Sequence, residues 1–281
     1  MSILKRCKDF VRWATPSSLW MRLRVLHIHY KRNSYGTRHV RHTFGGLPLL
    51  VELKDPDSAG WYDRDWEPLP EIEFLKDHRL VPGARVFDVG AHQGVVAMML
   101  ASRTAPGLVV AVEGNGFNAA AAERNASLNH LENIRVVHGA AAAEPGELLF
   151  SESSNGSVNK IAWGQTKVRA YTLDELSETY GLPDLLFIDV EGYEVEVLKG
   201  ARRTLAGRPD CFVEVHTGCG LEDFGYVPAD VQNFFSQQDY DLFIRQETDP
   251  AFLPKAFDAP LPQSRFFLIA LARQASAPPN A

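Results

Sequence analysis

The stretch "VFDVGAHQGVVAMMLA", residues 86–101, decides the fold. An apolar run leads to Asp88, glycines stand at positions 90 and 94, and helix-forming residues follow at once. Glycine allows a sharp turn at the end of a strand and a close approach by the next helix. The stretch therefore predicts a buried strand, a tight turn and a helix, with Asp88, Gly90 and Gly94 around the end of the strand.

A second stretch, "LLFIDVEGYEVEVLKGA" (residues 185–201), has the same form. Asp189 and Glu191 stand at the end of an apolar strand, and Gly192 supplies the turn. Two carboxylates are costly at such a position unless they are hydrated, hydrogen-bonded or bound to a ligand. The end of this strand is therefore predicted to belong to a functional site. An alternative is that Asp189 or Glu191 simply caps the following helix.

Apolar strands alternate with helices along the rest of the chain. Expected strands cover residues 84–90, 108–114, 133–139, 185–190, 211–216, 240–244 and 264–272. Expected helices cover residues 94–104, 117–130, 194–205 and 228–238, and two more strands, 146–153 and 167–173, surround a polar loop. Such alternation is typical of an α/β protein with a mostly parallel sheet and helices on both faces.

Four parts are expected along the chain. Residues 1–42 form a basic, aromatic-containing helical extension, and residues 43–82 form a lead-in with a strand near 49–53 and a helix over 69–80. Residues 83–272 form the core domain, and residues 273–281 form a frayed tail that is poor in apolar side chains.

Charge is distributed unevenly between the extension and the body. Residues 1–42 contain ten lysines and arginines and one acid, Asp9, although the whole chain has a formal net charge of −6. This contrast suggests attachment of residues 1–42 to an anionic membrane surface or an acidic partner. The alternative is that the extension packs on its own acidic body or on a second subunit. Nucleic acid is not an expected partner, because the acidic body would repel phosphate.

Cysteine usage and hydropathy indicate a cytoplasmic protein. The three cysteines form no CxxC pair, so neither a disulfide framework nor a zinc knuckle is predicted. The sequence lacks an apolar run long enough to span a bilayer, and its N-terminus is a poor signal peptide. A peripheral membrane contact through residues 1–42 is compatible with this location.

The ends of the first two core strands predict a nucleoside ligand. Glu113 ends the strand at residues 108–114, and a carboxylate there can accept hydrogen bonds from both ribose hydroxyls. The dinucleotide fingerprint is GxGxxG, but this chain has His92 where the second glycine belongs. A side chain there obstructs a diphosphate and suits a ligand without phosphate. The spacing favours S-adenosylmethionine over a nicotinamide dinucleotide.

Candidate catalytic residues stand at the ends of the next two strands. Asp189 or Glu191 could orient an acceptor hydroxyl or accept its proton. The strand at residues 211–216 ends in Glu214 and His216, and His216 is a candidate general base because of its ordinary pKa range. No metal site is predicted, because the histidine-bearing segments 27–30 and 38–42 have basic surroundings that disfavour a cation.

The order of these motifs resembles the FkbM-type family of S-adenosylmethionine-dependent methyltransferases over roughly residues 60 to 245. The most specific segment is residues 185–201, which resembles the family's Asp-x-Glu-Gly signature and the helix after it. The other segments are "DWEP" (65–68), "VFDVGAHQG" (86–94), "VVAVEGNGFNAAAAERNASLN" (109–129), "VRAYTLDEL" (168–176) and "VEVH" (213–216).

The resemblance implies a class I, Rossmann-like methyltransferase fold and O-methylation of sugar or natural-product hydroxyls. It implies that Asp189 and Glu191 lie by the transferred methyl group and that Glu113 holds the ribose. It further implies donor contacts for Asp88, Gly90 and Gly94, and positions near the adenine for Gly139 and Ala140. His92 departs from the family, which usually has asparagine there, and an imidazole can still donate a hydrogen bond.

The resulting hypothesis is an S-adenosylmethionine-dependent O-methyltransferase acting on a hydroxyl of a sugar, glycan or natural product. Two alternatives from other classes stay open. One is a non-catalytic donor-binding scaffold localised by its basic N-terminus. The other is an NAD-dependent oxidoreductase, which would bind NAD and not the sulfonium compound.

Overall fold

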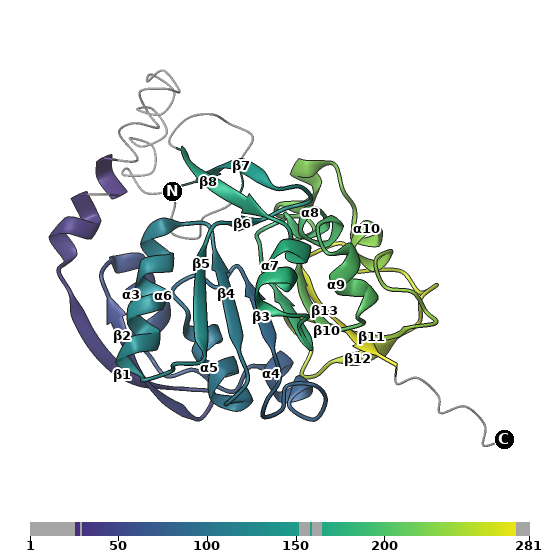
Figure 1. Cartoon of the computed structure of the whole chain (residues 1–281), viewed down its shortest axis with the longest axis horizontal. Coiled ribbons are helices and arrows are strands. Elements are labelled where there is room, and N and C mark those ends of the chain that lie inside the picture. Colours follow the sequence, from purple (N-terminus) through teal and green to yellow (C-terminus); the bar gives the residue numbers. More distant parts are fainter. Residues whose placement is uncertain (1–25, 29, 152–157, 159–164, 274–281) are drawn as a thin grey trace.

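An eight-stranded sheet forms the centre of the molecule (Figure 1). The computed structural model describes residues 26–28, 30–151, 158 and 165–273. The strand order is β12-β11-β13-β10-β9-β3-β4-β5. The strands are β3 (Val86–Val89), β4 (Val109–Glu113), β5 (Ile134–His138), β9 (Leu185–Ile188), β10 (Asp210–Val215), β11 (Tyr240–Gln246), β12 (Leu253–Lys255) and β13 (Phe266–Ala272).

The five strands from β5 to β10 are parallel, which confirms the predicted mostly parallel sheet. Strand β13 lies antiparallel between β10 and β11, and β12 is antiparallel to β11. The central strands β3, β4 and β9 are buried along their whole length. This burial explains their uninterrupted apolar sequences, since helices cover both faces of a parallel sheet.

Helices cover the sheet on both faces, as predicted, and two apolar cores separate the layers. Successive residues of β3 point to opposite cores, since Val86 belongs to one and Phe87 to the other. One core also holds residues of α4 (Pro70–Leu75), α5 (Val95–Thr104) and α6 (Gly116–Leu128). The other core holds residues of α7 (Leu173–Tyr180), α8 (Glu194–Lys199) and α10 (Pro228–Gln232), and α9 (Arg202–Ala206) packs on α7.

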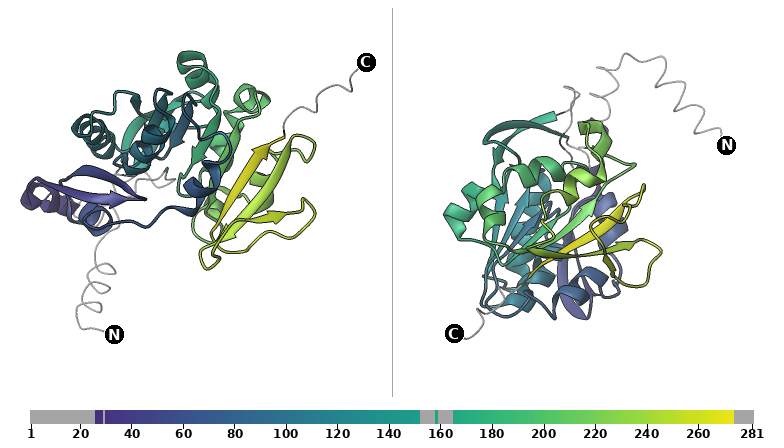
Figure 2. Two further views of the ribbon diagram at one scale, coloured as in Figure 1. Left: turned by 90° about the horizontal axis from the view of Figure 1, so that it is seen from below. Right: turned by 90° about the vertical axis from the view of Figure 1, so that its right-hand side faces the viewer.

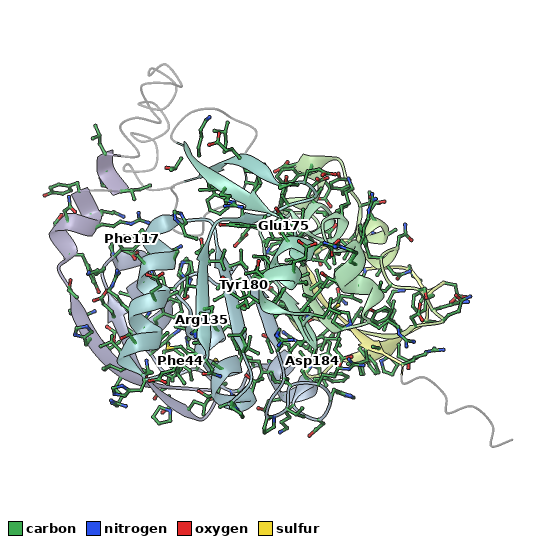
Figure 3. All side chains as sticks on the ribbon, viewed as in Figure 1. Phe44, Phe117, Arg135, Glu175, Tyr180 and Asp184 are labelled. Carbon is green, nitrogen blue, oxygen red and sulfur yellow. The ribbon has the colours of Figure 1, made fainter. Side chains whose placement is uncertain are left out.

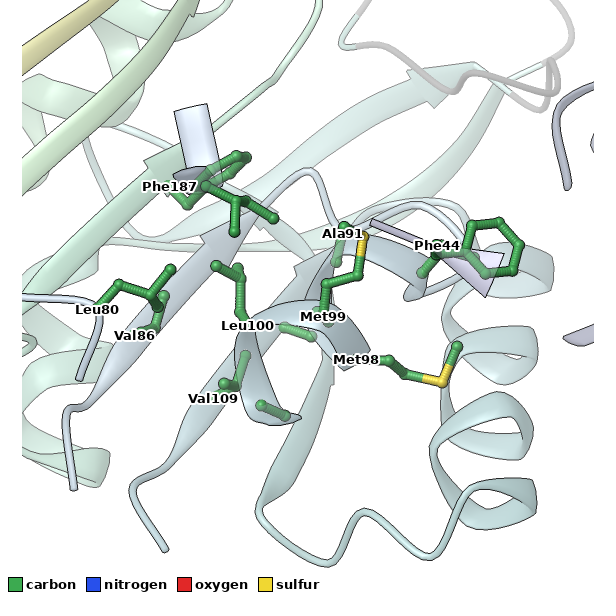
Figure 4. Packing of buried hydrophobic residues seen from close by; sticks show 14 of the residues in the cluster. Phe44, Leu80, Val86, Ala91, Met98, Met99, Leu100, Val109 and Phe187 are labelled. Carbon is green, nitrogen blue, oxygen red and sulfur yellow. The ribbon is translucent and has the colours of Figure 1, made fainter. Parts of the chain in front are cut away.

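The core on the α5 side is densely apolar (Figure 4). Met98, Met99 and Leu100 of α5 are fully buried, and Leu100 lies beside Val86 and Val109 of the sheet (Figure 4). Burying a side chain of this size contributes about 1.5–3 kcal/mol. This packing fixes α5 against β3 and therefore fixes the turn that joins them.

Two smaller sheets flank the central one. The hairpin of β1 (Arg38–Phe44) and β2 (Leu47–Leu53) lies at the opposite end of the molecule from β11–β13 (Figure 2). The predicted boundary at residues 42 and 43 therefore falls inside β1. Strands β6 (Ala140–Ala141), β7 (Gly146–Ser151) and β8 (Gln165–Tyr171) form a separate sheet that begins directly after β5. This second sheet therefore starts at the carboxyl ends of the parallel strands.

Helical residues 30–35 precede the hairpin. The guanidinium of Arg32 lies 4.0 Å from the ring centroid of Phe117. Phe117 lies at the start of α6 (Figure 3). Residues 1–25 of the predicted N-terminal extension, and the predicted tail apart from Arg273, lie outside the described residues. No helix in the described part of the chain is long and apolar enough to span a membrane.

Three helices are shorter than predicted. The helix expected over residues 69–80 ends at Leu75, and the one expected over 228–238 ends at Gln232. The helix expected over 194–205 is broken between Lys199 and Arg202. A Cβ atom at Gly200 would lie 2.0 Å from the carbonyl oxygen of Ala142, so the chain is in close backbone contact at this break.

Two helices were not predicted from the sequence. Helix α3 (Pro56–Tyr62) begins after Asp55, whose side chain accepts hydrogen bonds from the first turn. Helix α7 begins after Thr172, which forms a capping box with Glu175. Both starts carry recognisable cap signals, an acid before a proline and a threonine three residues before a glutamate.

We expect Gly94→Ala to destabilise the fold more than Gly83→Ala. Both glycines have positive φ, which costs an alanine about 1–2 kcal/mol. A Cβ atom at Gly94 would also lie 2.9 Å from Cβ of Ala122 in α6, whereas Gly83 faces open space. Overpacking adds about 1–3 kcal/mol. Urea unfolding measures the difference, and equal losses in the two variants would contradict the close approach of α5 and α6.

Candidate active site

A pocket of about 300 Å³ opens at the carboxyl ends of β3, β4 and β9. Eight of the ten predicted site residues line it: Asp88, Gly90, His92, Glu113, Gly139, Ala140, Asp189 and Glu191. In the part of the chain that the structure describes, Gly94 and His216 are not among the lining residues. The structure thus brings six of the seven expected donor residues and the two expected catalytic acids to one cavity.

Gly90 lies where the ends of β3 and β9 meet at the pocket. It has a φ of +93°, and a Cβ atom there would lie 1.7 Å from the carbonyl oxygen of Asp189. The amide N–H of Gly90 donates to Val112 O at 2.9 Å, and that of Asp189 donates to Val89 O at 2.9 Å. A glycine is therefore required here for two reasons, its backbone conformation and the close contact between the ends of β3 and β9.

Backbone amides hold the carboxylate of Glu113 at the end of β4. Its Oε2 accepts from the N–H of His92 at 2.8 Å, and its Oε1 accepts from the N–H of Asn115 at 2.6 Å. Burial raises the pKa of Glu113 to about 8, although these two bonds favour the ionised form. Each oxygen has a further lone pair, so the carboxylate can also accept from the hydroxyls of a ribose.

Asp88 presents a buried carboxyl group to the same pocket. The residue is 3% exposed, and its Oδ2 atom has no hydrogen-bond partner within the described residues. Burial raises the pKa of Asp88 to about 7. A buried polar atom without a partner is expensive, so a bound ligand with hydrogen-bond donors would relieve that cost. S-adenosylmethionine fits this requirement, because it carries two ribose hydroxyls and an ammonium group.

His92 belongs to an aromatic wall of the pocket. Its Nδ1 lies 2.5 Å from the hydroxyl oxygen of Tyr62, and its ring centroid lies 5.1 Å from that of Trp61. Trp66 completes the wall and contacts the ring of Tyr62. These aromatic residues come from α3 and the segment after it. Since α3 was not predicted, the sequence did not reveal that they and His92 form one wall.

Gly94 has a packing role in this structure. It caps the start of α5 with a φ of +80°, and a Cβ atom at this position would lie 3.1 Å from Cα of Ala122 in α6. The sequence predicted both a close helix approach and a donor contact at this position, and the geometry supports the first.

A cluster of acids surrounds His216 beside the pocket. His216 is 2% exposed, and its Nε2 lies 3.7 Å from Oδ1 of Asp189, 3.6 Å from Oε2 of Glu191 and 3.6 Å from Oε1 of Glu214. On the other side of the ring, Nδ1 lies 2.6 Å from Oε1 of Glu194. Asp189 and Glu191 belong to both the cluster and the pocket wall. The cluster is therefore continuous with the cavity.

Glu194, at the start of α8, is not among the site residues predicted from the sequence. Glu194 is fully buried, and its Oε1 also accepts from the N–H of Gly192 at 2.9 Å. Helix α8 starts at the rim of a buried strand, so the first turn of the helix faces the interior. Acids that directly follow the Asp189 and Glu191 pair were the signal that could have identified Glu194. Tyr193 occupies the N-cap position of α8, so neither Asp189 nor Glu191 is the N-cap residue of that helix.

Burial and mutual repulsion perturb the ionisation of this cluster. Burial, and then the charge of Glu214, raise the pKa of Asp189 well above its usual range, although its side chain is 44% exposed to the pocket. Burial also raises the pKa of Glu214. For His216, burial lowers the pKa, but the bond to Glu194 and the surrounding carboxylates outweigh it and raise the pKa to about 9. Such clustered, perturbed groups are typical of functional sites.

Comparisons with known proteins agree with the site. The methyltransferase FkbM domain matches residues 88–242. A candidate methyltransferase from Jannaschia sp. (strain CCS1) is 29% identical over 140 residues, which cover 41% of this chain and 50% of that protein. The hexuronic acid methyltransferase AglP of Haloferax volcanii is 31% identical over 87 residues, which cover 29% of this chain and 36% of that protein. The chain thus spans half or less of the length of these relatives.

Solved methyltransferases align with this chain at low sequence identity. An rRNA methylase from Streptococcus thermophilus aligns with a TM-score of 0.46 and 11% identity, covering 73% of this chain and 95% of that one. A SAM-dependent O-methyltransferase from Thermotoga maritima aligns with a TM-score of 0.42 and 15% identity, covering 85% of this chain and 79% of that one.

The family match contains the turn after β3, the end of β4 and the Asp189–Glu194 segment, which are the parts of the chain that build the site. It covers more than half of the 281 residues. The chain therefore belongs to the FkbM methyltransferase domain family, a family of S-adenosylmethionine-dependent methyltransferases.

Proposed function

We propose that this protein transfers the methyl group of S-adenosylmethionine to a hydroxyl oxygen of a sugar, glycan or related natural product. One observation carries the proposal. The pocket that fits the donor shares Asp189 and Glu191 with a cluster of acids. Groups that can hold a donor and groups that can handle an acceptor proton therefore meet at one cavity.

The donor end of the pocket would use Glu113 and Asp88. Glu113, held by two backbone amides, would accept from the ribose hydroxyls, and Asp88 would gain a partner for its buried Oδ2. Gly139 and Ala140 line the pocket beyond β5, where the adenine is expected. Bound S-adenosylmethionine supplies a methyl group that its sulfonium charge makes electrophilic.

The acceptor end would use Asp189 and Glu191. The acceptor oxygen forms a bond to the methyl carbon as the bond from carbon to sulfur breaks, and the hydroxyl proton leaves through a carboxylate to solvent. Alignment of the two reactants and general-base assistance are the main contributions that a protein makes to such a transfer. Asp189 and Glu191 reach the pocket, whereas His216 lies behind them. His216 would therefore position these carboxylates rather than meet the acceptor itself.

A sugar-like acceptor is supported by a groove next to the pocket. Tyr193 and Val158 line both the pocket and this groove. Phe224 and Tyr226 add aromatic surface, and Glu196 adds a polar group. Aromatic faces with nearby polar groups suit the mixed apolar and hydroxyl surface of a sugar ring. The name of the Haloferax relative, a hexuronic acid methyltransferase, points to the same class of acceptor.

The alternatives predict different ligands or no turnover. An oxidoreductase would bind NAD, but the imidazole of His92 occupies the position where a dinucleotide site needs a glycine. A non-catalytic scaffold would bind S-adenosylmethionine without releasing the demethylated product. The cytoplasmic location and the membrane or partner contact of residues 1–42 stay predictions.

Glu113→Gln is expected to weaken S-adenosylmethionine binding by at least about tenfold, because a hydrogen bond to a charged group contributes about 1.5–3 kcal/mol. Isothermal titration calorimetry measures the affinity, and thermal unfolding checks that the variant is folded. Glu178→Gln is the matched control, since Glu178 is exposed on α7 and pairs with Arg203. Equal affinities in the wild type and in Glu113→Gln would place the ribose elsewhere.

Incubation with methyl-labelled donor and a panel of neutral and uronate-containing oligosaccharides tests the acceptor. We expect the label to stay on the sugar after mild alkali, because a methyl ether resists hydrolysis. Release of labelled methanol would show that a carboxyl group is the acceptor and would contradict the hydroxyl. Donor binding without transfer to any member of the panel would support the scaffold alternative.

Asp189→Asn is expected to reduce the rate of methyl transfer by about 10²–10⁴-fold, the usual contribution of a positioned acid–base group. Donor affinity should stay close to that of the wild type, because Asp88 and Glu113 are untouched. Asp241→Asn, which changes an exposed partner of Arg273, is the control. Turnover of Asp189→Asn at the wild-type rate would remove Asp189 from the mechanism.

A further inference from the structure

We propose that Asp189, Glu214 and His216 form a binding site for one divalent cation at the edge of the pocket. The ligand atoms of these three side chains all lie within 4.8 Å of one another. Carboxylate oxygens and a neutral imidazole nitrogen are the ligands that Mn²⁺ and similar divalent cations accept together. They come from the ends of the neighbouring strands β9 and β10, so the sheet itself sets their spacing.

The orientation of His216 supports the assignment. Its ring is 2% exposed, and Nδ1 lies 2.6 Å from Oε1 of the fully buried Glu194. A carboxylate in this position holds a proton on Nδ1, so Nε2 is the nitrogen that a cation would bind. The cation would displace the proton that Nε2 carries in the charged ring. This pairing of carboxylate and histidine is the usual second layer of a metal site.

The distances from Nε2 of His216 to the neighbouring carboxylate oxygens are too long for hydrogen bonds. They are close to the distances between ligand atoms around one metal ion. In the described chain, Nε2 has three carboxylate neighbours, at 3.6–3.7 Å, beyond the range of a hydrogen bond. With bonds of about 2.0–2.2 Å from a cation to nitrogen and oxygen ligands, adjacent ligand atoms are separated by a comparable distance. The separations around Nε2 are therefore of the size expected between ligand atoms that share one cation.

The charge of the surroundings also favours a cation. Four carboxylates, those of Asp189, Glu191, Glu194 and Glu214, lie around one imidazole. Arg265 compensates part of this charge, with its Nη1 3.1 Å from Oε1 of Glu214, and it also pairs with Glu247. A divalent ion between the carboxylates would balance most of the remaining negative charge. Without such an ion, burial makes that charge costly.

The position of the site gives the cation a role in the proposed function, on which this part of the inference rests. Asp189 is both a ligand and a pocket-wall residue, so the cation would lie where the acceptor enters. There it would orient the acceptor hydroxyl and favour loss of its proton to Glu191, while the methyl group leaves sulfur for oxygen. The binding of the cation itself depends on the three ligands alone.

The test uses the full chain after removal of metals with a chelator, in the absence of donor and acceptor. Mn²⁺ is added, and electron paramagnetic resonance of free Mn²⁺ together with calorimetry gives stoichiometry and affinity. We expect one ion per chain, and at least tenfold weaker binding in both His216→Asn and Glu214→Gln. Glu178→Gln should bind Mn²⁺ as the wild type does. Thermal unfolding identifies any variant that does not fold. If one of the two ligand variants fails to fold, Mn²⁺ binding by the other one tests the site.

The outcomes separate this inference from the proposed function. No Mn²⁺ binding by the folded wild type, or equal binding in the wild type and both ligand variants, overturns the metal site. Methyl transfer by chelated protein together with absent Mn²⁺ binding leaves the proposed function standing without the metal. Stoichiometric binding that is lost in the ligand variants, but without methyl transfer to any acceptor, supports the metal site and counts against the proposed function.

Discussion

The close backbone contact between Gly90 and Asp189 is the constraint on which the rest of the site depends. The carbonyl oxygen of Asp189 occupies the space where any other residue at position 90 would place its Cβ. This contact brings the end of β3, which carries the donor residues, against the end of β9, which carries the acids. Two hydrophobic cores, one on each face of the sheet, hold both strands in register. The pocket is therefore a consequence of how the parallel strands end.

The free energy spent on burying carboxyl groups is the second organising feature. Asp88, Glu113 and Glu194 are each at most 4% exposed, and stability alone would favour apolar side chains at such positions. Backbone amides stabilise Glu113, and His216 stabilises Glu194. Asp88 keeps an oxygen without a partner in the described chain. Local costs of this kind are usual where a protein binds ligands or performs chemistry.

The sequence predicted the layered fold and most of the site because the decisive residues are local to strand ends. Apolar runs followed by Asp88, Glu113 or Asp189 identify the rim without knowledge of the tertiary structure. The sequence did not predict which residues approach from distant segments. Helix α3 brings an aromatic wall to His92, and the first turn of α8 turns Glu194 inward onto His216. Those contacts depend on how whole elements pack, which the periodicity of one segment does not reveal.

The most direct test of the account is a crystal structure of the protein with S-adenosylhomocysteine, the demethylated donor. We expect the ribose hydroxyls within hydrogen-bond distance of Glu113, the adenine near Gly139 and Ala140, and the sulfur atom directed toward Asp189. A nucleoside bound away from Glu113, or a sulfur atom directed away from the acids, would contradict the central claim that the ends of β3, β4 and β9 form one site for methyl transfer.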